Sequence, residues 1–122
     1  MQLAKPQTTQ TGARDRRRAP RVFADKAVEI DVVGGGRSRA WAADISLGGM
    51  SLLTSDVPRY GTFILIGLGQ PVTPFPIRVP ATVRWTRRCR FGVQFVLLGV
   101  RETAVLLAFI NARLASQGAD SG

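Results

Sequence analysis

The sequence predicts an all-β-dominated fold, in which a small antiparallel barrel of short strands is followed by one C-terminal helix. Three observations predict it. Apolar and polar residues alternate over short segments, glycine or proline separates these segments, and a stretch near the C-terminus lacks both and has helical periodicity. With 122 residues, 45% of them hydrophobic, the chain has room for one domain around one modest core.

The N-terminal region carries charge and little that could enter a core. Residues 1–15 are rich in Gln, Thr, Lys and Arg, and we expect them to form a flexible arm. Residues 16–25 form a basic segment that we expect to be a loop, because Pro20 lacks the backbone N–H that a helix would use there. The barrel is therefore expected to span residues 26–97.

The first strand and the turn after it have the clearest pattern. Val28, Ile30 and Val32 alternate with charged residues, which is typical of a half-buried strand. The three glycines of Gly34–Gly36 can adopt the positive φ that a tight hairpin connection demands. The hairpin predicts a return strand over residues 39–45.

The remaining strands are separated by turn-forming residues. The predicted segments are a turn at 46–49, a strand at 50–54, a loop at 58–60, a strand at 62–67, a proline-rich connection at 69–76, a strand at 77–86, a turn at 87–90 and a last strand at 91–97. In the strand at 77–86, one face is predicted to carry Val79, Ala81, Val83 and Trp85.

Residues 100–115 are predicted to form the C-terminal helix, because they lack glycine and proline. Four apolar side chains are spaced to share one face of it: Leu106, Phe109, Ile110 and Leu114. Ser116 and Gly118 are expected to end the helix, which leaves residues 116–122 as a flexible tail.

The charge of the chain indicates an anionic partner. The formal net charge is +9, from 17 basic and 8 acidic residues, and only Lys5 and Lys26 among the basic residues are not arginine. A guanidinium is a planar fork that pairs with phosphate through two bonds and stacks on flat rings, whereas lysine is a point charge. The expected partner is therefore an anion, which can also be aromatic.

The composition speaks against several other classes of protein. Histidine is absent, which removes the usual general base at neutral pH and the commonest metal ligand. The single cysteine, Cys89, allows neither an internal disulfide nor a cysteine-based zinc site. The apolar runs are shorter than the roughly 20 residues of a membrane span, and the N-terminus has no apolar signal region. We therefore expect a cytoplasmic protein with no catalytic activity, metal or cofactor.

Two short motifs carry the candidate binding residues. Arg17 and Arg21 form an R-x-x-x-R element inside an arginine-rich segment. Downstream, Asp44, Ser46 and Gly49 form a D-x-S-x-x-G element. Either element alone is common. The informative feature is the pair in this order, separated by a predicted strand, a glycine turn and a return strand.

The two motifs together resemble the PilZ domain, a bacterial receptor module for cyclic di-GMP. The resemblance covers residues 16–115 and includes a G-V-x-F pattern in the last strand, Gly92-Val93-Gln94-Phe95, with a tryptophan upstream at Trp85. It implies a six-stranded antiparallel β-barrel with a C-terminal α-helix. It also implies that the ligand is cyclic di-GMP.

The resemblance gives each motif residue a role. Arg17 and Arg21 would clamp guanine and phosphate, because the guanidinium fork fits both groups. Asp44 would accept from the N1–H and N2–H2 donors of guanine, with Ser46 as a short neighbouring donor and acceptor. Gly49 lacks a Cβ, so the backbone could take a positive φ or approach the ligand closely.

The arginine cluster carries more charge than one ligand needs. Arg16 directly precedes the R-x-x-x-R element and Arg18 lies inside it, whereas one cyclic di-GMP has two phosphates. PilZ domains with such an extra arginine tend to bind an intercalated pair of ligands. The resemblance therefore implies two ligands per chain, with Arg16 and Arg18 supporting the second. We expect the bound arginine loop to change conformation and to signal to an unidentified partner protein.

Other interpretations stay open at the level of sequence. A small basic barrel that binds nucleic acid would explain the charge, although such barrels use an exposed aromatic series that we do not expect on these strand faces. Asp44 and Ser46 can bond their own backbone in a turn, which is compatible with a ligand role. Trp41 and Trp85 are expected in the core or at its rim.

Overall fold

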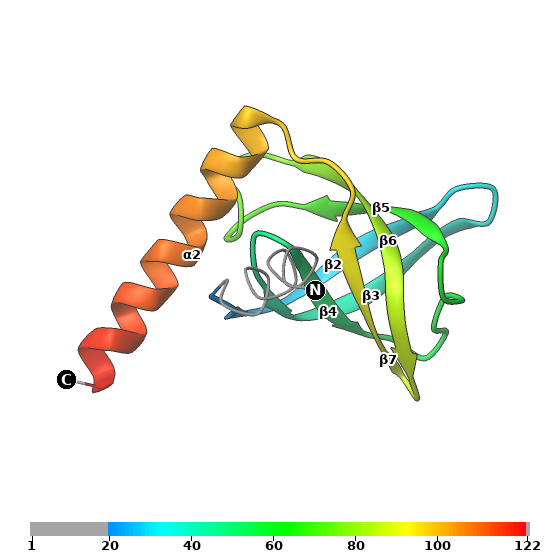
Figure 1. The fold of residues 1–122 in the computed structure, drawn as a ribbon, viewed down its shortest axis with the longest axis horizontal. Coiled ribbons are helices and arrows are strands. Elements are labelled where there is room, and N and C mark those ends of the chain that lie inside the picture. The colour runs from blue at the N-terminus through cyan, green and yellow to red at the C-terminus, as the bar shows by residue number, and fades with distance from the viewer. Residues whose placement is uncertain (1–19, 122) are drawn as a thin grey trace, which may run out of the picture.

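The structure is a computed structural model that describes residues 20–121. Within this range the chain forms six strands and one helix (Figure 1). They are β2 (Val22–Val32), β3 (Gly36–Ile45), β4 (Gly49–Leu53), β5 (Phe63–Leu68), β6 (Ile77–Arg87), β7 (Arg90–Phe95) and α2 (Val100–Ser121). No helix in the described range is long and apolar enough to cross a membrane.

The strands close into a barrel in which every neighbouring pair is antiparallel. Their order is β2-β3-β4-β7-β6-β5, and β5 pairs with β2 to close the barrel. The helix lies to one side of the barrel in Figure 1. The prediction of a six-stranded antiparallel barrel with a C-terminal helix is therefore confirmed.

The β2–β3 hairpin forms where the three glycines predicted it. β2 and β3 pair from Val32 opposite Gly36 down to Val22 opposite Ile45. Gly34 and Gly36 have φ angles of 82° and 107°, which residues other than glycine rarely adopt. The long register of this hairpin sets the position of every residue at its far end, where the two motifs lie.

β2 begins at Val22, within the segment that we predicted to be a loop up to residue 25. The alternation of the strand is interrupted by a bulge between Phe23 and Lys26, where Asp25 has a φ of 53°. A bulge inserts an unpaired residue and shifts the two-residue period, so the sequence pattern hides the start of the strand. Aspartate tolerates the left-handed region better than most residues.

The core fills the barrel and extends under one face of α2. The largest fully buried side chains of the strands are Val22, Ile30, Ile45, Met50, Leu52, Ile64, Ile66, Val79, Val83 and Phe91. On the helix, Leu106, Phe109 and Ile110 are buried and Leu114 packs partly against the core, which confirms the predicted apolar face.

The helix continues to Ser121, beyond its predicted end at residue 115. Ser116 and Gly118 do not end it, because a glycine inside a helix costs only about 1 kcal/mol relative to alanine. No proline follows them to break the backbone hydrogen bonds. The predicted tail over residues 116–122 is therefore mostly helical.

The prediction that Trp85 shares a face with Val83 is wrong. Val83 is fully buried, whereas Trp85 is 39% exposed, because a register shift lies between them in the β6–β7 pair. The indole lies over Gly92, where a Cβ would overlap its Nε1 atom. The glycine of the G-V-x-F pattern thus gives room to this tryptophan, while Val93 and Phe95 point into the core.

Gly49 gives room for the close pairing of β4 with β7. Its φ is not in the left-handed region, so of the two reasons considered for this glycine, a positive φ does not apply. A Cβ at this position would overlap the carbonyl oxygen of Val93 on β7, with which β4 pairs. Glycine therefore allows the backbones of β4 and β7 to approach each other at the start of their ladder.

We expect Gly49→Ala to lower the free energy of unfolding by about 1–3 kcal/mol, because the added methyl group can only be accommodated if β4 moves away from β7. Gly69→Ala is the matched control, since a Cβ at Gly69 would meet nothing within 4 Å. Its effect should stay within about 0.5 kcal/mol. Urea denaturation of both variants measures this, and equal stabilities would contradict the role given to Gly49.

Candidate functional site

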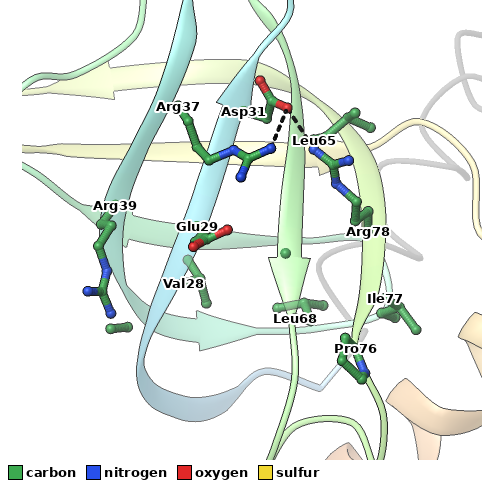
Figure 2. Close-up of a pocket in the computed structure, with 12 residues that line it drawn as sticks. Val28, Glu29, Asp31, Arg37, Arg39, Leu65, Leu68, Pro76, Ile77 and Arg78 are labelled. Carbon is green, nitrogen blue, oxygen red and sulfur yellow. Dashed lines mark hydrogen bonds and ion pairs between the residues drawn. The ribbon is translucent and has the colours of Figure 1, made fainter.

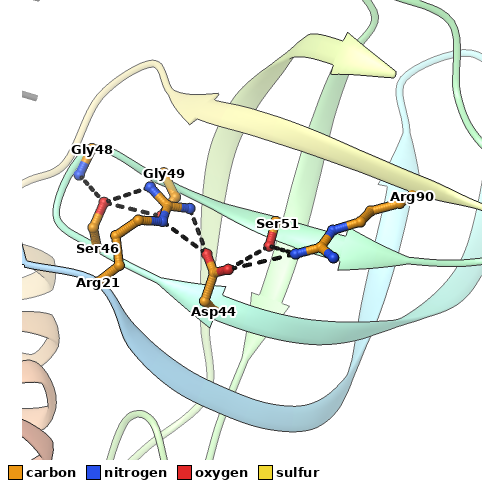
Figure 3. A network of polar contacts seen from close by, with 7 residues as sticks. All are labelled: Arg21, Asp44, Ser46, Gly48, Gly49, Ser51 and Arg90. Carbon is orange, nitrogen blue, oxygen red and sulfur yellow. Dashed lines mark hydrogen bonds and ion pairs between the residues drawn. The ribbon is translucent and has the colours of Figure 1, made fainter. Parts of the chain in front are cut away.

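The described residues of the two motifs meet on the outside of the barrel (Figure 3). Arg21 directly precedes β2, Asp44 is next to last in β3, and Ser46 lies in the turn before β4. Because Val22 pairs with Ile45, the hairpin brings the start of β2 beside the end of β3. Arg21 thereby becomes a neighbour of Asp44, 23 positions away in the sequence, and of Ser46, 25 positions away.

Arg21 and Asp44 form an ion pair through the Nε–Nη2 edge of the guanidinium. The distance from Nε to Oδ1 is 3.0 Å and that from Nη2 to Oδ1 is 2.5 Å. The side chain of Arg21 is 48% exposed and that of Asp44 is 24% exposed. Both groups are therefore open to a ligand that approaches from solvent. In the absence of a ligand, their charges neutralise each other.

Ser46 holds the turn that carries the second motif. Its Oγ accepts the backbone N–H of Gly48 at 3.1 Å, and its backbone N–H donates to the carbonyl of Gly49 at 2.8 Å. Arg21 Nη1 lies 3.5 Å from the same Oγ. The residue is only 2% exposed, so its contacts are with the protein itself: it stabilises the turn and contacts the guanidinium of Arg21. The turn interpretation of Ser46 is thus confirmed, and its contact with guanine stays a prediction.

Two residues that the motifs do not contain complete the site. Ser51 on β4 donates from Oγ to Asp44 Oδ2 at 2.8 Å, and Arg90 on β7 donates from Nη2 to Ser51 Oγ at 3.3 Å. Arg90 Nη2 also lies 3.8 Å from Asp44 Oδ2. Asp44 is therefore held between two arginines, as Figure 3 shows. We call Arg21, Asp44, Ser46, Ser51 and Arg90 the motif site.

The sequence contained a usable signal for both added residues. Ser51 lies two positions after Gly49, and Arg90 lies two positions before Gly92. Since side chains of a strand alternate, each shares the outward face of its motif neighbour. The polar turn predicted over residues 87–90 included Arg90, which instead begins β7 beside β4.

An aromatic ring borders the motif site. Across the sheet, Asp44 pairs with Ser51, Ser51 with Gly92 and Gly92 with Trp85, so the four lie in one row over four strands. Trp41, also on the outer face, is 45% exposed and donates from Nε1 to Asp25 at 3.2 Å. Both tryptophans therefore belong to the rim, which is one of the two expected positions, and not to the core.

Three of the predicted ligand residues are not among those that the structure describes. Arg16, Arg17 and Arg18 lie outside the described residues, which begin at residue 20. Of the predicted binding residues, the structure therefore brings together Arg21, Asp44, Ser46 and Gly49. Within the described range no three acidic or cysteine side chains gather in a way that could hold a metal ion.

A hollow lies on another side of the barrel. It measures about 430 Å³ and is lined by residues of β2, β3, β5 and β6 (Figure 2). Its acid Asp31 is paired with Arg78 at 2.6 Å and with Arg37 at 4.0 Å. It holds no motif residue. The motif site is a charged outer surface rather than a deep cavity.

The chain is similar to known proteins in both sequence family and fold. The sequence matches the PilZ domain family over residues 15–112. A comparison with curated proteins finds no match. The family match covers both motifs and all six strands, so it includes every residue of the motif site.

Solved structures with the same fold are similar over most of the chain. The PilZ domain of YcgR from Escherichia coli, solved with c-di-GMP, is 20% identical over 88% of this chain and 99% of that chain, with a TM-score of 0.64. The PilZ domain of CeSA from a cellulose-synthesising bacterium is 16% identical over 77% and 97%, with a TM-score of 0.63. The inhibitor of motility MotI/DgrA from Bacillus subtilis is 19% identical over 83% and 52%, with a TM-score of 0.64. At these identities the likeness shows the fold.

Proposed function

This chain belongs to the PilZ domain family, and on that premise we propose that it is a receptor for cyclic di-GMP that signals to another protein. The observation that carries the proposal is the meeting of Arg21 and Asp44 on one open surface of the barrel, next to the turn that Ser46 fixes. The similar PilZ domain of YcgR was solved with this same ligand, which supports the choice.

The chemistry of the motif site suits this ligand. Cyclic di-GMP offers phosphodiesters and guanine edges to the same surface. The fork of Arg21 can pair with phosphate or with guanine O6 and N7, and the carboxylate of Asp44 complements the guanine N1–H and N2–H2 donors. Because Arg21 and Asp44 neutralise each other without ligand, each gains a ligand partner in place of the other on binding.

We propose that the N-terminal arginines complete the site. Arg16, Arg17 and Arg18 add three positive charges just upstream of Arg21. An anion bound at Arg21 would attract these charges and draw residues 1–20 toward the barrel, where a partner protein could recognise the new surface. The chain would act as an adaptor without catalysis of its own.

We propose that the chain acts in the cytoplasm. The reducing conditions there suit the exposed free thiol of Cys89.

Binding of nucleic acid is the alternative function. The half-exposed Trp41 and Trp85 favour it more than the sequence did, because stacking on aromatic rings is how such barrels hold single strands. They lie beside a compact site with one central carboxylate, however, and a carboxylate repels a continuous phosphate backbone. The motif site therefore suits a compact dianion better than it suits a nucleic-acid strand.

The first expectation concerns the ligand contacts. Arg21→Ala and Asp44→Ala should each weaken cyclic di-GMP binding at least about tenfold, since each contact with guanine or phosphate contributes roughly 1.4 kcal/mol, which is a factor of ten. Isothermal titration calorimetry measures the dissociation constants of the wild type and both variants.

A matched ion pair on the barrel supplies the control. Asp31 and Arg78 lie 2.6 Å apart and are 32% and 54% exposed, close to the values of the motif pair. Asp31→Ala and Arg78→Ala should bind as the wild type does. If all four variants bind equally, the motif site is not the ligand site. A steep fall of affinity with salt, of the size that many phosphate contacts produce, would support nucleic acid instead.

The second expectation concerns stoichiometry. We propose that the wild type binds two cyclic di-GMP molecules per chain, because Arg16 and Arg18 supply charge for two further phosphates. Arg16→Leu should shift the titration toward one ligand while the primary contacts of Arg21 and Asp44 remain. Saturation of the wild type at one ligand per chain would overturn this assignment.

A further inference from the structure

Arg90 lies at the motif site without belonging to either motif. Its guanidinium extends from β7 across β4 to the Oδ2 side of Asp44, opposite Arg21 (Figure 3). The side chain is 45% exposed. A cation in this place is therefore available to a ligand that the carboxylate binds.

The contact between Arg90 and Asp44 is loose. Nη2 is 3.8 Å from Oδ2, which is too long for a hydrogen bond, and Ser51 Oγ is the one hydrogen-bond acceptor of Arg90 among the described residues. A guanidinium has five N–H donors. Arg90 thus keeps donors that a ligand can use, and no short bond to Asp44 has to break first.

The hydroxyl of Ser51 fixes the geometry between the two charged groups. Ser51 is 3% exposed, donates to Asp44 and accepts from Arg90. Because it is buried, it holds carboxylate and guanidinium side by side on the surface above it. The two charged groups form one paired acceptor and donor surface rather than two independent charges.

A guanine edge matches this surface. Its O6 acceptor lies directly beside the N1–H donor, which is followed by N2–H2. When Asp44 accepts from N1–H and N2–H2, guanine O6 comes to lie next to a carboxylate oxygen, and the two oxygens repel. A guanidinium beside that carboxylate removes the repulsion and donates to O6.

Of the two arginines that flank Asp44, Arg90 is better placed for this task. Arg21 makes two short bonds to Oδ1 and a further contact with Ser46, and it must break these bonds before it can pair with phosphate or with guanine O6 and N7. Arg90 needs no displacement, and Ser51 keeps it in position. The N1–H donor therefore belongs at Oδ2, with O6 on the Arg90 side.

We propose that Arg90 is a guanine-selecting residue, whose guanidinium donates to O6 of the guanine that Asp44 holds. The inference rests on the proposed function, since it names a further ligand contact at the same site. It goes beyond the motifs, because it assigns recognition of one atom of the base to a strand of the barrel that neither motif includes.

The test pairs a change in the protein with a change in the ligand. Cyclic di-GMP and its analogue with 6-thioguanine in place of both guanines share phosphates, N1–H and N2–H2, and differ in the acceptor at position 6, where sulfur is a weak one. The full-length wild type should bind the analogue at least about tenfold more weakly than cyclic di-GMP. Arg90→Met should weaken cyclic di-GMP binding by about the same factor. The dissociation constants of this variant for the two ligands should then agree within about threefold.

The control is Arg88→Met, which removes an equal charge from the exposed β6–β7 turn and should keep the wild-type preference. Arg90→Lys keeps a donor at position 90, so it should retain part of the preference, and it serves if Arg90→Met does not fold. Equal weakening of both ligands by Arg90→Met would mean attraction to phosphate alone and would overturn the proposal. An Arg90→Met variant that binds cyclic di-GMP as tightly as the wild type does would also overturn the proposal. A wild type that binds neither ligand would overturn the proposed function as well.

Discussion

The ion pair between Arg21 and Asp44 is the interaction that ties the two motifs into one surface. It joins the residue before β2 to the end of β3, and it forms only because the β2–β3 register places Val22 opposite Ile45. The turn fixed by Ser46 and the close approach of β4 to β7 at Gly49 set the backbone around it. The fold therefore serves the site chiefly by fixing the register of these strands.

Stability and binding are carried by different faces of the same strands. Ile45 and Leu52 point inward and are fully buried, whereas Asp44 and Ser51 point outward to the motif site. Exposed ion pairs contribute only about 0–1 kcal/mol, so a ligand can replace the Arg21–Asp44 bond at little cost to the fold. The apolar interior keeps the outer groups in position while their partners change.

Much of this arrangement could be predicted from the sequence, and the exceptions share a cause. The hairpin at Gly34, the face of α2 around Leu106 and the pairing of the two motifs follow from local patterns. The bulges near Asp25 and before Trp85 do not, because one inserted residue inverts the apparent face of everything beyond it.

The membership of Ser51 and Arg90 in the site depended on strand order. Their outward direction follows from alternation, but the sequence does not state that β7 pairs with β4 rather than with another strand. The helix end at Ser121 was missed for another reason, since Gly118 weakens a helix without breaking it. Local signals thus identified the motif residues, and only the closed barrel revealed their neighbours.

Amide hydrogen exchange of the wild type with and without cyclic di-GMP tests the central claim most directly, because it reports where the ligand acts on the whole chain. We expect protection to rise in residues 1–20 and in the turn from Ser46 to Gly49, while β5, on the other side of the barrel, stays unchanged. Exchange that is the same in both states, or protection that rises at β5 and the hollow beside it, would contradict the account.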